Sequence, residues 1–302
     1  MSPVHRIAMW SGPRNMSTTM MRSFGARADC AAVDEPFYAA WLVAAGETHP
    51  MQTEILASQP TDPQGVAEGL LAPLPDGATV QYQKHMTHHM PPGFPLDWGD
   101  QCDHAFLIRH PARVIASYAR KMNNLSLEAI GFPQQARLFN EMRARTGKVP
   151  TVIDSDRVLA NPRAVLTRLC AALEIAWDEN MLAWSPGPKP EDGAWAPHWY
   201  DAVWTSEGFG NAPGPLPVLS GEAAEIEKEA PPAISRLTRR LFRHVGDRRS
   251  PRGTSGVLVA GRKADLGSHL IKCGAQVAFR RLAAHSFCLR IEDVGYGFAA
   301  IH

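Results

Sequence analysis

The segment that most constrains the fold of this chain is residues 5–27, HRIAMWSGPRNMSTTMMRSFGAR, in which an apolar strand runs into a Gly/Pro turn and then a hydroxyl-rich helix start. Backbone N–H groups remain free at a helix N-terminus, and the hydroxyls of residues 17–19 and the charge of Arg14 stand beside them. This order is typical of a site for a phosphate-like anion. The alternative is a plain connection between two elements. The loop is not a Walker A motif, which needs a second Gly and a Lys, and the G-x-G-x-x-G fingerprint is absent.

Predicted strands and helices alternate along the rest of the first two thirds of the chain. The predicted strands are residues 6–11, 31–33, 80–83, 105–108 and 149–153, and the predicted helices are residues 16–27, 51–58, 64–71, 112–122, 126–146 and 163–174. Such alternation predicts an α/β fold with a mostly parallel central sheet and helices on both faces.

Ligands of such folds bind at the carboxyl ends of the strands. Polar residues that follow the ends of predicted strands are Arg14, Glu35, Lys84, His85 and Arg109. We therefore expect separate parts of the chain to converge on one cleft.

A second strand-to-helix junction lies at Arg109-His110-Pro111, where the predicted strand ends and a helix begins near residue 112. Ser117 falls roughly one and a half turns into that helix. The fork of an arginine together with a hydroxyl suits a phosphate dianion. Taken alone, the segment also fits a salt-bridged arginine and a solvated helix serine.

The chain is predicted to contain a main domain of residues 1–245, which includes a covering segment, followed by a C-terminal tail. Residues 184–214 are rich in Trp, Pro and Gly, which predicts either a long loop over the site or an ordered cap whose tryptophans fill space. Residues 222–245 are predicted to be helical. Residues 246–302 are predicted to form a basic linker and a poorly ordered C-terminal extension, to which we assign no function.

Composition excludes several classes of partner. The 31 Lys and Arg residues balance 30 Asp and Glu residues. Because the chain lacks the basic excess of a nucleic-acid-binding protein, we expect no nucleic acid partner. No run reaches the roughly 18 apolar residues of a membrane span, and no signal peptide is evident, so we expect a cytoplasmic protein without a membrane partner. The cysteines show no C-x-x-C pair and are expected to be reduced thiols: Cys30, Cys102, Cys170, Cys273 and Cys288.

Two motifs resemble those of the P-loop sulfotransferases that use 3′-phosphoadenosine 5′-phosphosulfate (PAPS). The first is Gly12-Pro13-Arg14-Asn15-Met16-Ser17-Thr18-Thr19, which is similar to the family's 5′-phosphosulfate loop. The second runs from Leu107 to Tyr118 and is similar to the 3′-phosphate segment, in which an Arg closes a strand and a Ser follows eight residues later. The resemblance spans about residues 5–245 and is strongest to the bacterial sulfotransferase-like branch, which has G-P-R-x-x-S-T and D-E-P-F-Y elements.

The resemblance implies PAPS as cosubstrate and assigns the nucleotide contacts. Residues 12–19 would bind the 5′-phosphosulfate through Arg14, the backbone amides and the hydroxyls, while Arg109 and Ser117 would bind the 3′-phosphate. The chain departs from many members at Asn15-Met16, where Ser-Gly is common. A side chain in place of Gly restricts the backbone there, so the prediction of binding is firmer than that of turnover.

Sulfuryl transfer requires a base that takes the proton of the acceptor and cations that stabilise the developing charge. Glu35 is the first candidate for the base and His85 the second, while Lys84 and Arg14 are candidates for charge stabilisation. The alternatives are that Glu35 caps a turn or pairs with an arginine and that His85 is an ordinary loop histidine. We expect no metal, because the loop that contains His88 and His89 offers no regular element to fix ligands.

The sequence thus predicts a sulfotransferase acting on a hydroxyl or amine of a small molecule. An NTP-dependent phosphotransferase of P-loop type would need a Mg²⁺-binding carboxylate and a loop lysine. A non-catalytic nucleotide-binding protein is the third possibility. The acceptor depends on the shapes of loops 38–75 and 184–214, and the oligomeric state is not predicted.

Overall fold

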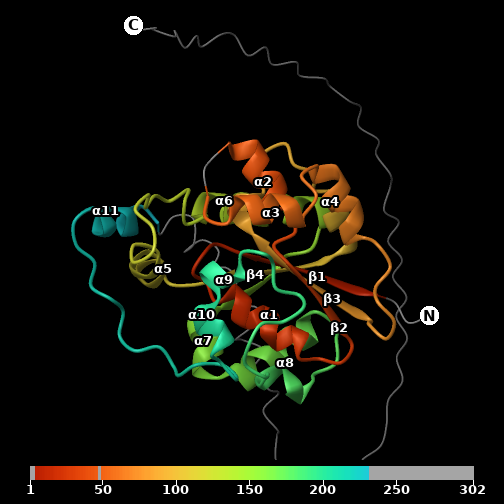
Figure 1. Ribbon diagram of the computed structural model, residues 1–302. Helices are drawn as coiled ribbons and strands as arrows, with labels where there is room; N and C mark the ends of the chain where they lie inside the picture. The colour runs from red at the N-terminus through yellow and green to blue at the C-terminus, as the bar shows by residue number, and fades with distance from the viewer. Residues whose placement is uncertain (1–3, 47–48, 231–302) are drawn as a thin grey trace, which may run out of the picture. The chain divides into compact units, whose positions relative to one another are not determined.

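The computed structural model describes residues 4–46 and 49–230 (Figure 1). At its centre is a parallel sheet of five strands in the order β2-β3-β1-β4-β5. The strands are β1 (His5–Ser11), β2 (Cys30–Asp34), β3 (Val80–Met86), β4 (Asp103–Ile108) and β5 (Thr151–Asp154). The predicted α/β fold with a parallel sheet is therefore confirmed.

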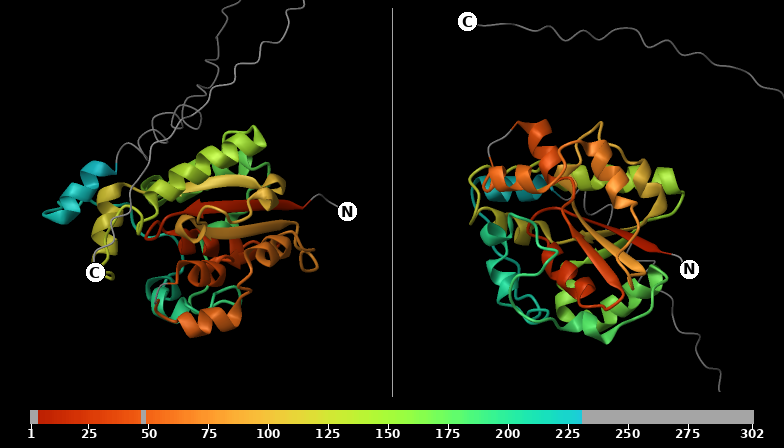
Figure 2. Two further views of the ribbon diagram at one scale, coloured as in Figure 1. Left: turned by 90° about the horizontal axis from the view of Figure 1, so that it is seen from above. Right: turned by 45° about the vertical axis from the view of Figure 1, so that its right-hand side comes forward.

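Helices lie on both faces of this sheet (Figure 2). The first half of the chain contributes α1 (Ser17–Gly25), α2 (Tyr38–Ala45), α3 (Gln52–Ser58), α4 (Pro63–Leu70) and the short 3-10 helices η1 (Thr87–His89) and η2 (Asp97–Gln101). The second half contributes α5 (Pro111–Tyr118), α6 (Phe132–Thr146), α7 (Ser155–Ala160), α8 (Pro162–Ala172), η3 (Glu179–Leu182), α9 (Ala196–Trp199), α10 (Asp201–Trp204) and α11 (Glu222–Glu229).

The central strand β1 shows why both faces are covered. Side chains alternate along a strand, so Ile7 and Met9 enter the apolar cluster that contains residues of α1 and α8. Ala8 and Trp10 enter the cluster that contains residues of α4 and α6. All four side chains are fully buried, as is typical of a central parallel strand.

Strand β3 is longer than the sequence predicts, and this difference matters for the site. The predicted strand ends at Gln83, whereas β3 continues to Met86 and every residue in it is buried. The reason is pairing with the neighbouring strands. Lys84 stands opposite Met9 of β1 and Asp34 of β2, and the pairing with β1 continues with His85 opposite Trp10. Lys84 and His85 therefore lie within the strand rather than after it.

Some helix boundaries also differ from the predicted ones. Helix α5 ends at Tyr118 rather than near residue 122, and α6 starts at Phe132 rather than near residue 126. The intervening residues form turns and loop. The remainder of the predicted helix 222–245 beyond residue 230 and the predicted extension 246–302 lie outside the described residues.

Residues 184–214 form an ordered covering segment, with α9 and α10 as its only described helices. Trp195 and Tyr200 are buried in the core cluster that contains residues of α1. Trp199 and Tyr200 also line the main cavity. The segment therefore combines features of the two alternatives: Trp195 fills space in the core, whereas Trp199 lines the cavity, and the helices α9 and α10 replace part of the expected loop.

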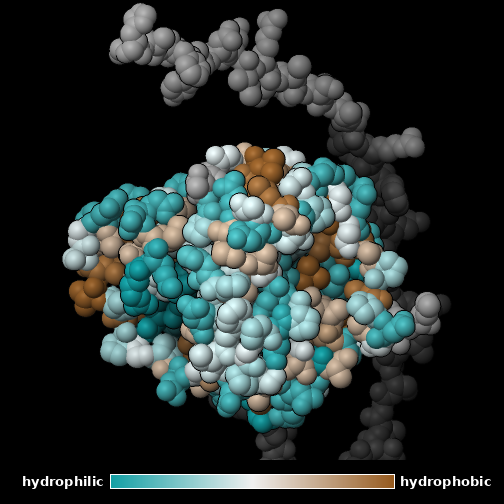
Figure 3. All heavy atoms as spheres, viewed as in Figure 1, coloured by the Kyte–Doolittle hydropathy of each residue, from teal (hydrophilic) through white to brown (hydrophobic). Residues whose placement is uncertain are grey.

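The face of the molecule shown in Figure 3 is mostly hydrophilic, with scattered apolar side chains. The exposed large apolar side chains among the described residues come from four separate parts of the chain: Val4, Val43, Val149, and the pair Leu216 and Val218. Within the described ranges, no helix combines the length and hydropathy that crossing a bilayer requires.

Candidate active site

A cavity of about 820 Å³ opens at the carboxyl ends of the strands. It brings together Arg14 after β1, Glu35 after β2, Lys84 in β3 and Arg109 after β4. Ser117 of α5 also lines it. The expected convergence of separate segments on one cleft is thus present, although His85 does not take part in it.

The loop between β1 and α1 has the backbone of an anion site. Arg14 and Met16 both adopt left-handed conformations, with φ of 64° and 63°. The N–H groups of residues 15–19 donate no hydrogen bond to any described residue, so they remain available to an anion. A Cβ at Gly12 would lie 2.5 Å from the carbonyl oxygen of Ile130, which explains the glycine.

Some residues of this loop hold it in place through hydrogen bonds, and most of them line the cavity. Asn15 is 1% exposed; its side chain donates to the carbonyl of Leu107 and its own carbonyl accepts from Ser155. Asn15 therefore holds the loop against β4 and α7 through these two hydrogen bonds. The members of the predicted phosphosulfate loop that line the cavity are Pro13, Arg14, Asn15, Met16, Ser17, Thr18 and Thr19. Gly12 lies next to the carbonyl of Ile130 and is not among the residues that line the cavity.

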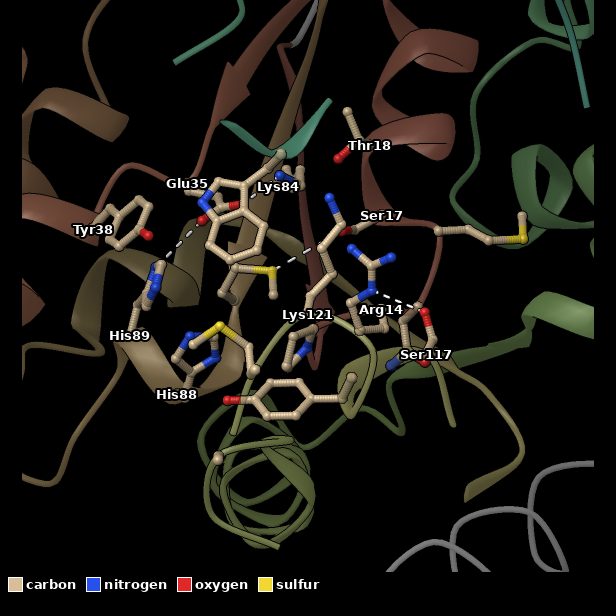
Figure 4. Close-up of a pocket in the computed structure, with 18 of the residues that line it drawn as sticks. Arg14, Ser17, Thr18, Glu35, Tyr38, Lys84, His88, His89, Ser117 and Lys121 are labelled. Carbon is tan, nitrogen blue, oxygen red and sulfur yellow. Dashed lines mark hydrogen bonds and ion pairs between the residues drawn. The ribbon is translucent and has the colours of Figure 1, made fainter. Parts of the chain in front are cut away.

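The two predicted phosphate motifs touch each other. Arg14 Nε donates to Ser117 Oγ at 2.9 Å, and Arg109 donates to the carbonyl oxygen of Arg14 at 2.9 Å (Figure 4). The terminal nitrogens of Arg14 donate to no described residue, which leaves them for a ligand. The two motifs, more than ninety residues apart in sequence, therefore build one continuous wall.

This wall is short of negative charge. Burial lowers the pKa of Arg14 and of Arg109, and the nearby cation of Arg120 lowers both further. Asp156 acts in the opposite direction on Arg109, at 3.9 Å from its Nε. Crowded cations with lowered pKa values are stabilised by a bound anion.

A buried polar cluster, formed by Asp34, Glu35, Lys84 and Tyr200, lies next to this wall. Lys84 Nζ donates to Asp34 Oδ1 at 2.8 Å, to Glu35 Oε1 at 2.5 Å and to the Tyr200 hydroxyl at 2.7 Å. The Tyr200 hydroxyl donates to Asp34 Oδ2 at 2.6 Å and accepts from Trp195 Nε1 at 3.1 Å. Asp34 Oδ2 also accepts from the backbone N–H of Gly193 at 3.2 Å.

These hydrogen bonds leave one carboxylate oxygen of the cluster without a hydrogen-bond donor among the described residues. An ammonium group has three N–H donors, and all three of Lys84 are used by protein groups. Lys84 is 1% exposed, so its charge acts on a ligand through Glu35 rather than through a direct hydrogen bond. Glu35 Oε2 accepts no hydrogen bond from the described residues and is the oxygen left for a proton.

The electrostatic balance at Glu35 suits a group that exchanges a proton near neutral pH. Burial raises the pKa of Glu35 to about 7, with Lys84 opposing the rise and Asp34 adding to it. Glu35 also adopts a positive φ of 40°, which is rare for a residue with a side chain and is frequent at functional sites.

His89 lies beside the open oxygen of Glu35, and the sequence analysis did not select it. His89 Nδ1 is 3.6 Å from Glu35 Oε2. The imidazole stacks on Tyr38 with ring centroids 4.2 Å apart and on Trp41 at 4.7 Å. Burial holds its pKa well below the usual range, so the ring is neutral. In the sequence, the adjacent pair His88-His89 suggests only metal ligands.

His85, the second predicted base, is not at the cavity. It is 1% exposed and stacks on Trp10, with ring centroids 4.6 Å apart. Because neighbouring residues of a strand face opposite sides, the extension of β3 that directs Lys84 to the cavity directs His85 to the far face of the sheet. The prediction of His85 as a base is therefore corrected. Among the described residues, no group of three or more His, Cys, Asp or Glu side chains is placed to hold a metal ion.

Two further cavity residues went unnoticed in the sequence. Lys121 follows α5 and points into the cavity (Figure 4), where it adds a cation to Arg14 and Arg109. Its signal was its place four residues after Ser117, one helical turn along. Tyr200 lies 116 residues from Lys84, and no local pattern identifies it.

Several solved structures are similar to this chain in fold. The sulfotransferase domain from the curacin biosynthetic pathway is 14% identical, with a TM-score of 0.45 over 75% of this chain and 97% of that domain. The sulfotransferase from Alicyclobacillus acidocaldarius is 11% identical, with a TM-score of 0.48 over 80% of this chain and 96% of the other.

Two curated relatives from Arabidopsis thaliana are similar to part of the chain. They are the branched-chain-amino-acid aminotransferase-like proteins 1 and 2, each 34% identical over 203 residues, or 67% of this chain. These residues make up 36% of each relative, so the chain spans about a third of their length.

The sequence model of the sulfotransferase domain family matches residues 5–233. The match includes all five strands of the sheet and every described residue that lines the cavity. Since it extends over well more than half of the chain, the protein belongs to the sulfotransferase domain family.

Proposed function

We propose that this protein transfers a sulfuryl group from PAPS to a hydroxyl or amine of a small-molecule acceptor. The observation that carries the proposal is the direct contact between Arg14 and Ser117, beside the carboxylate of Glu35. This contact joins two wall segments rich in cations and free donors, as a nucleotide with phosphate groups at two positions requires.

The residues at the wall fit such a nucleotide. The free N–H groups of residues 15–19 and the terminal nitrogens of Arg14 would hold the 5′-phosphosulfate. Arg109, Ser117 and Lys121 would hold the 3′-phosphate. When bound, the nucleotide supplies an activated sulfuryl group, which the acceptor attacks while the bond from sulfur to the 5′-phosphate oxygen breaks.

Glu35 would take the proton of the acceptor at Oε2. A base works best when its pKa lies near the working pH, and burial brings the pKa of Glu35 to about 7. Lys84 holds the other oxygen, Oε1, and so fixes the direction of the carboxylate. His89, with Nδ1 at 3.6 Å, would orient the same oxygen or the acceptor hydroxyl.

Tyr200 and Asp34 would act as positioning residues. They accept two of the three hydrogen bonds of Lys84, so Glu35 shares the ammonium charge with Asp34. This sharing maintains enough basicity at Glu35 for it to accept a proton.

Thermal shift in the presence of nucleotides tests the proposal. We expect 3′,5′-adenosine bisphosphate at about 100 times its Kd to raise Tm by roughly 5–10 °C, since a ligand of the native state stabilises it by mass action. Mg-ATP and ADP at the same concentrations should raise Tm less. Equal or stronger stabilisation by Mg-ATP would favour the phosphotransferase alternative and contradict the proposal.

Two variants make this test specific. Arg109→Ala should abolish the shift caused by the bisphosphate. Arg145→Ala is the matched control, because Arg145 forms a surface ion pair with Asp100 away from the cavity and should leave the shift unchanged. Nucleotide binding without any turnover would instead indicate the non-catalytic alternative.

A further inference from the structure

Asp156, near the start of α7, is an acidic side chain to which the proposed function gives no role. It lies within ion-pair distance of two arginines, Arg109 and Arg113, and does not itself line the cavity. We call the surface formed by Arg14, Arg109 and Ser117 the cationic wall. Asp156 therefore acts on the cationic wall from outside the cavity.

The two carboxylate oxygens of Asp156 serve different arginines. Oδ2 accepts a hydrogen bond from Arg113 Nε at 2.8 Å. Oδ1 lies 3.9 Å from Arg109 Nε, which is within ion-pair distance but beyond the length of a hydrogen bond. Both Oδ1 and Arg109 Nε are buried and have no hydrogen-bond partner among the described residues. Because buried polar atoms are costly when unpaired, each of these two atoms is the natural partner of the other.

Arg113, on α5, holds Asp156 in this place. Its side chain is 14% exposed, and each of its three nitrogens donates a hydrogen bond. Besides Asp156, the acceptors are the carbonyl oxygens of Gly214 and Pro215, which belong to the segment that runs between α10 and α11 (Figure 1). A guanidinium fixed at all three nitrogens has a single orientation. The carboxylate that it binds is therefore held beside Arg109.

Arg109 needs such a support because the charges around it are mostly positive. Its Nη1 donates to the carbonyl oxygen of Arg14 at 2.9 Å, while its Nη2 donates to no described residue and is left for a ligand. Burial lowers the pKa of this guanidinium, and so do the charges of Arg113, Arg14 and Arg120. The carboxylate of Asp156 raises that pKa, because it offsets the repulsion between the cations.

From these contacts we infer that Asp156 is a positioning residue for Arg109. It offsets the repulsion from the other arginines and fixes the guanidinium in the direction in which Nη2 meets an anionic group. Arg113 is the support that keeps Asp156 beside Arg109, and Asp156 itself touches no ligand. The inference rests on the proposed function, since it concerns an arginine to which that function assigns the 3′-phosphate.

The sign of the effect of Asp156→Asn on nucleotide binding tests the inference. If Asp156 were only a nearby negative charge, its removal would strengthen the binding of an anion. If it positions Arg109, its removal weakens that binding. By calorimetry, we expect the Kd of 3′,5′-adenosine bisphosphate to rise by about tenfold. The Kd of 5′-AMP, which lacks the 3′-phosphate, should change by less than about twofold.

Three further variants connect this effect to the contacts. Asp156→Glu keeps the carboxylate and should retain most of the affinity for the bisphosphate. Arg113→Lys keeps the positive charge but not the fork of donors, so it should raise the Kd of the bisphosphate by about threefold or more. It also replaces Asp156→Asn as the test if that variant does not fold. Asp100→Asn is the matched control, because it removes the carboxylate of another Asp–Arg pair, with Arg145, away from the cavity.

The outcomes separate this inference from the proposed function. If the native protein binds the bisphosphate and Asp156→Asn binds it equally or more tightly, the positioning role is wrong and the proposed function stands. The same holds if Asp156→Asn loses affinity for both nucleotides to the same extent, since the change then disturbs the whole site. If the native protein does not bind the bisphosphate, the proposed function fails and the inference fails with it. A loss confined to the bisphosphate and restored in Asp156→Glu supports the inference.

Discussion

Glu35 is the residue on which the proposed chemistry depends, and its neighbours shift its pKa in opposite directions. Burial raises its pKa, Lys84 lowers it and Asp34 raises it again, with a result of about 7. A carboxylate paired with lysine alone would ionise far below neutral pH and would be a weak base. Asp34 prevents this by sharing the same ammonium group, with Lys84 Nζ at 2.8 Å.

Replacing Asp34 tests this balance. In Asp34→Asn the negative charge that raises the pKa of Glu35 is gone, so that pKa should fall by about one unit, roughly 1.4 kcal/mol. Activity that needs ionised Glu35 declines as pH falls below its pKa. The acidic limb of the pH profile of kcat/KM should therefore move from near pH 7 to lower pH.

Asp201→Asn is the control, since Asp201 is exposed on α10 and should leave the limb in place. An acidic limb that stays near pH 7 in Asp34→Asn, or moves to higher pH, would show that Asp34 does not set the pKa of Glu35.

At the scale of elements, Tyr200 is a main point of attachment between the covering segment and the sheet. Tyr200 connects α9 and α10 with the carboxyl ends of β2 and β3 by hydrogen bonds to Asp34 and Lys84. Gly193 and Trp195 of the same segment add bonds to this cluster. The segment that covers the cavity therefore also orders the polar groups beneath it.

Tyr200→Phe removes one hydroxyl from this junction. Lys84, Asp34 and Trp195 each lose a buried partner, so the free energy of unfolding should fall by about 1–3 kcal/mol in urea denaturation. Tyr82→Phe is the matched control, because the Tyr82 hydroxyl is buried without a hydrogen-bond partner among the described residues. Its removal should leave stability unchanged or slightly raise it. Equal losses in both variants would contradict the role given to Tyr200.

The elements also show what local sequence can and cannot predict. The alternation of apolar runs and helical patterns predicts the order of β1 to β5, since each strand is buried and bounded by turn residues. It fails at the end of β3, because Lys84 and His85 look like the start of a loop. Partners from other parts of the chain allow both side chains to be buried. Lys84 bonds to Asp34 and Tyr200, and His85 stacks on Trp10.

At the scale of the whole molecule, the cationic wall of Arg14, Arg109 and Ser117 is readable from sequence, and the surroundings of Glu35 are not. Arg14 and Arg109 carry local signals, each at a junction from strand to helix. His89 comes next to Glu35, and Tyr200 next to its neighbours Asp34 and Lys84, only through the fold, from 54 and 165 residues away from Glu35 in the numbering of the chain. The sequence therefore predicts the residues of the cationic wall and misses the groups that surround Glu35.

The measurement that tests the central claim most directly is sulfuryl transfer itself, followed as release of 3′,5′-adenosine bisphosphate from PAPS with an alcohol acceptor. We expect turnover by the native protein and a loss in kcat of about 10²–10⁴ in Glu35→Gln, as for removal of a general base. The Tm shift caused by the bisphosphate should stay the same in both. Turnover of Glu35→Gln at the native rate, or no release of the bisphosphate by the native protein, would contradict the account.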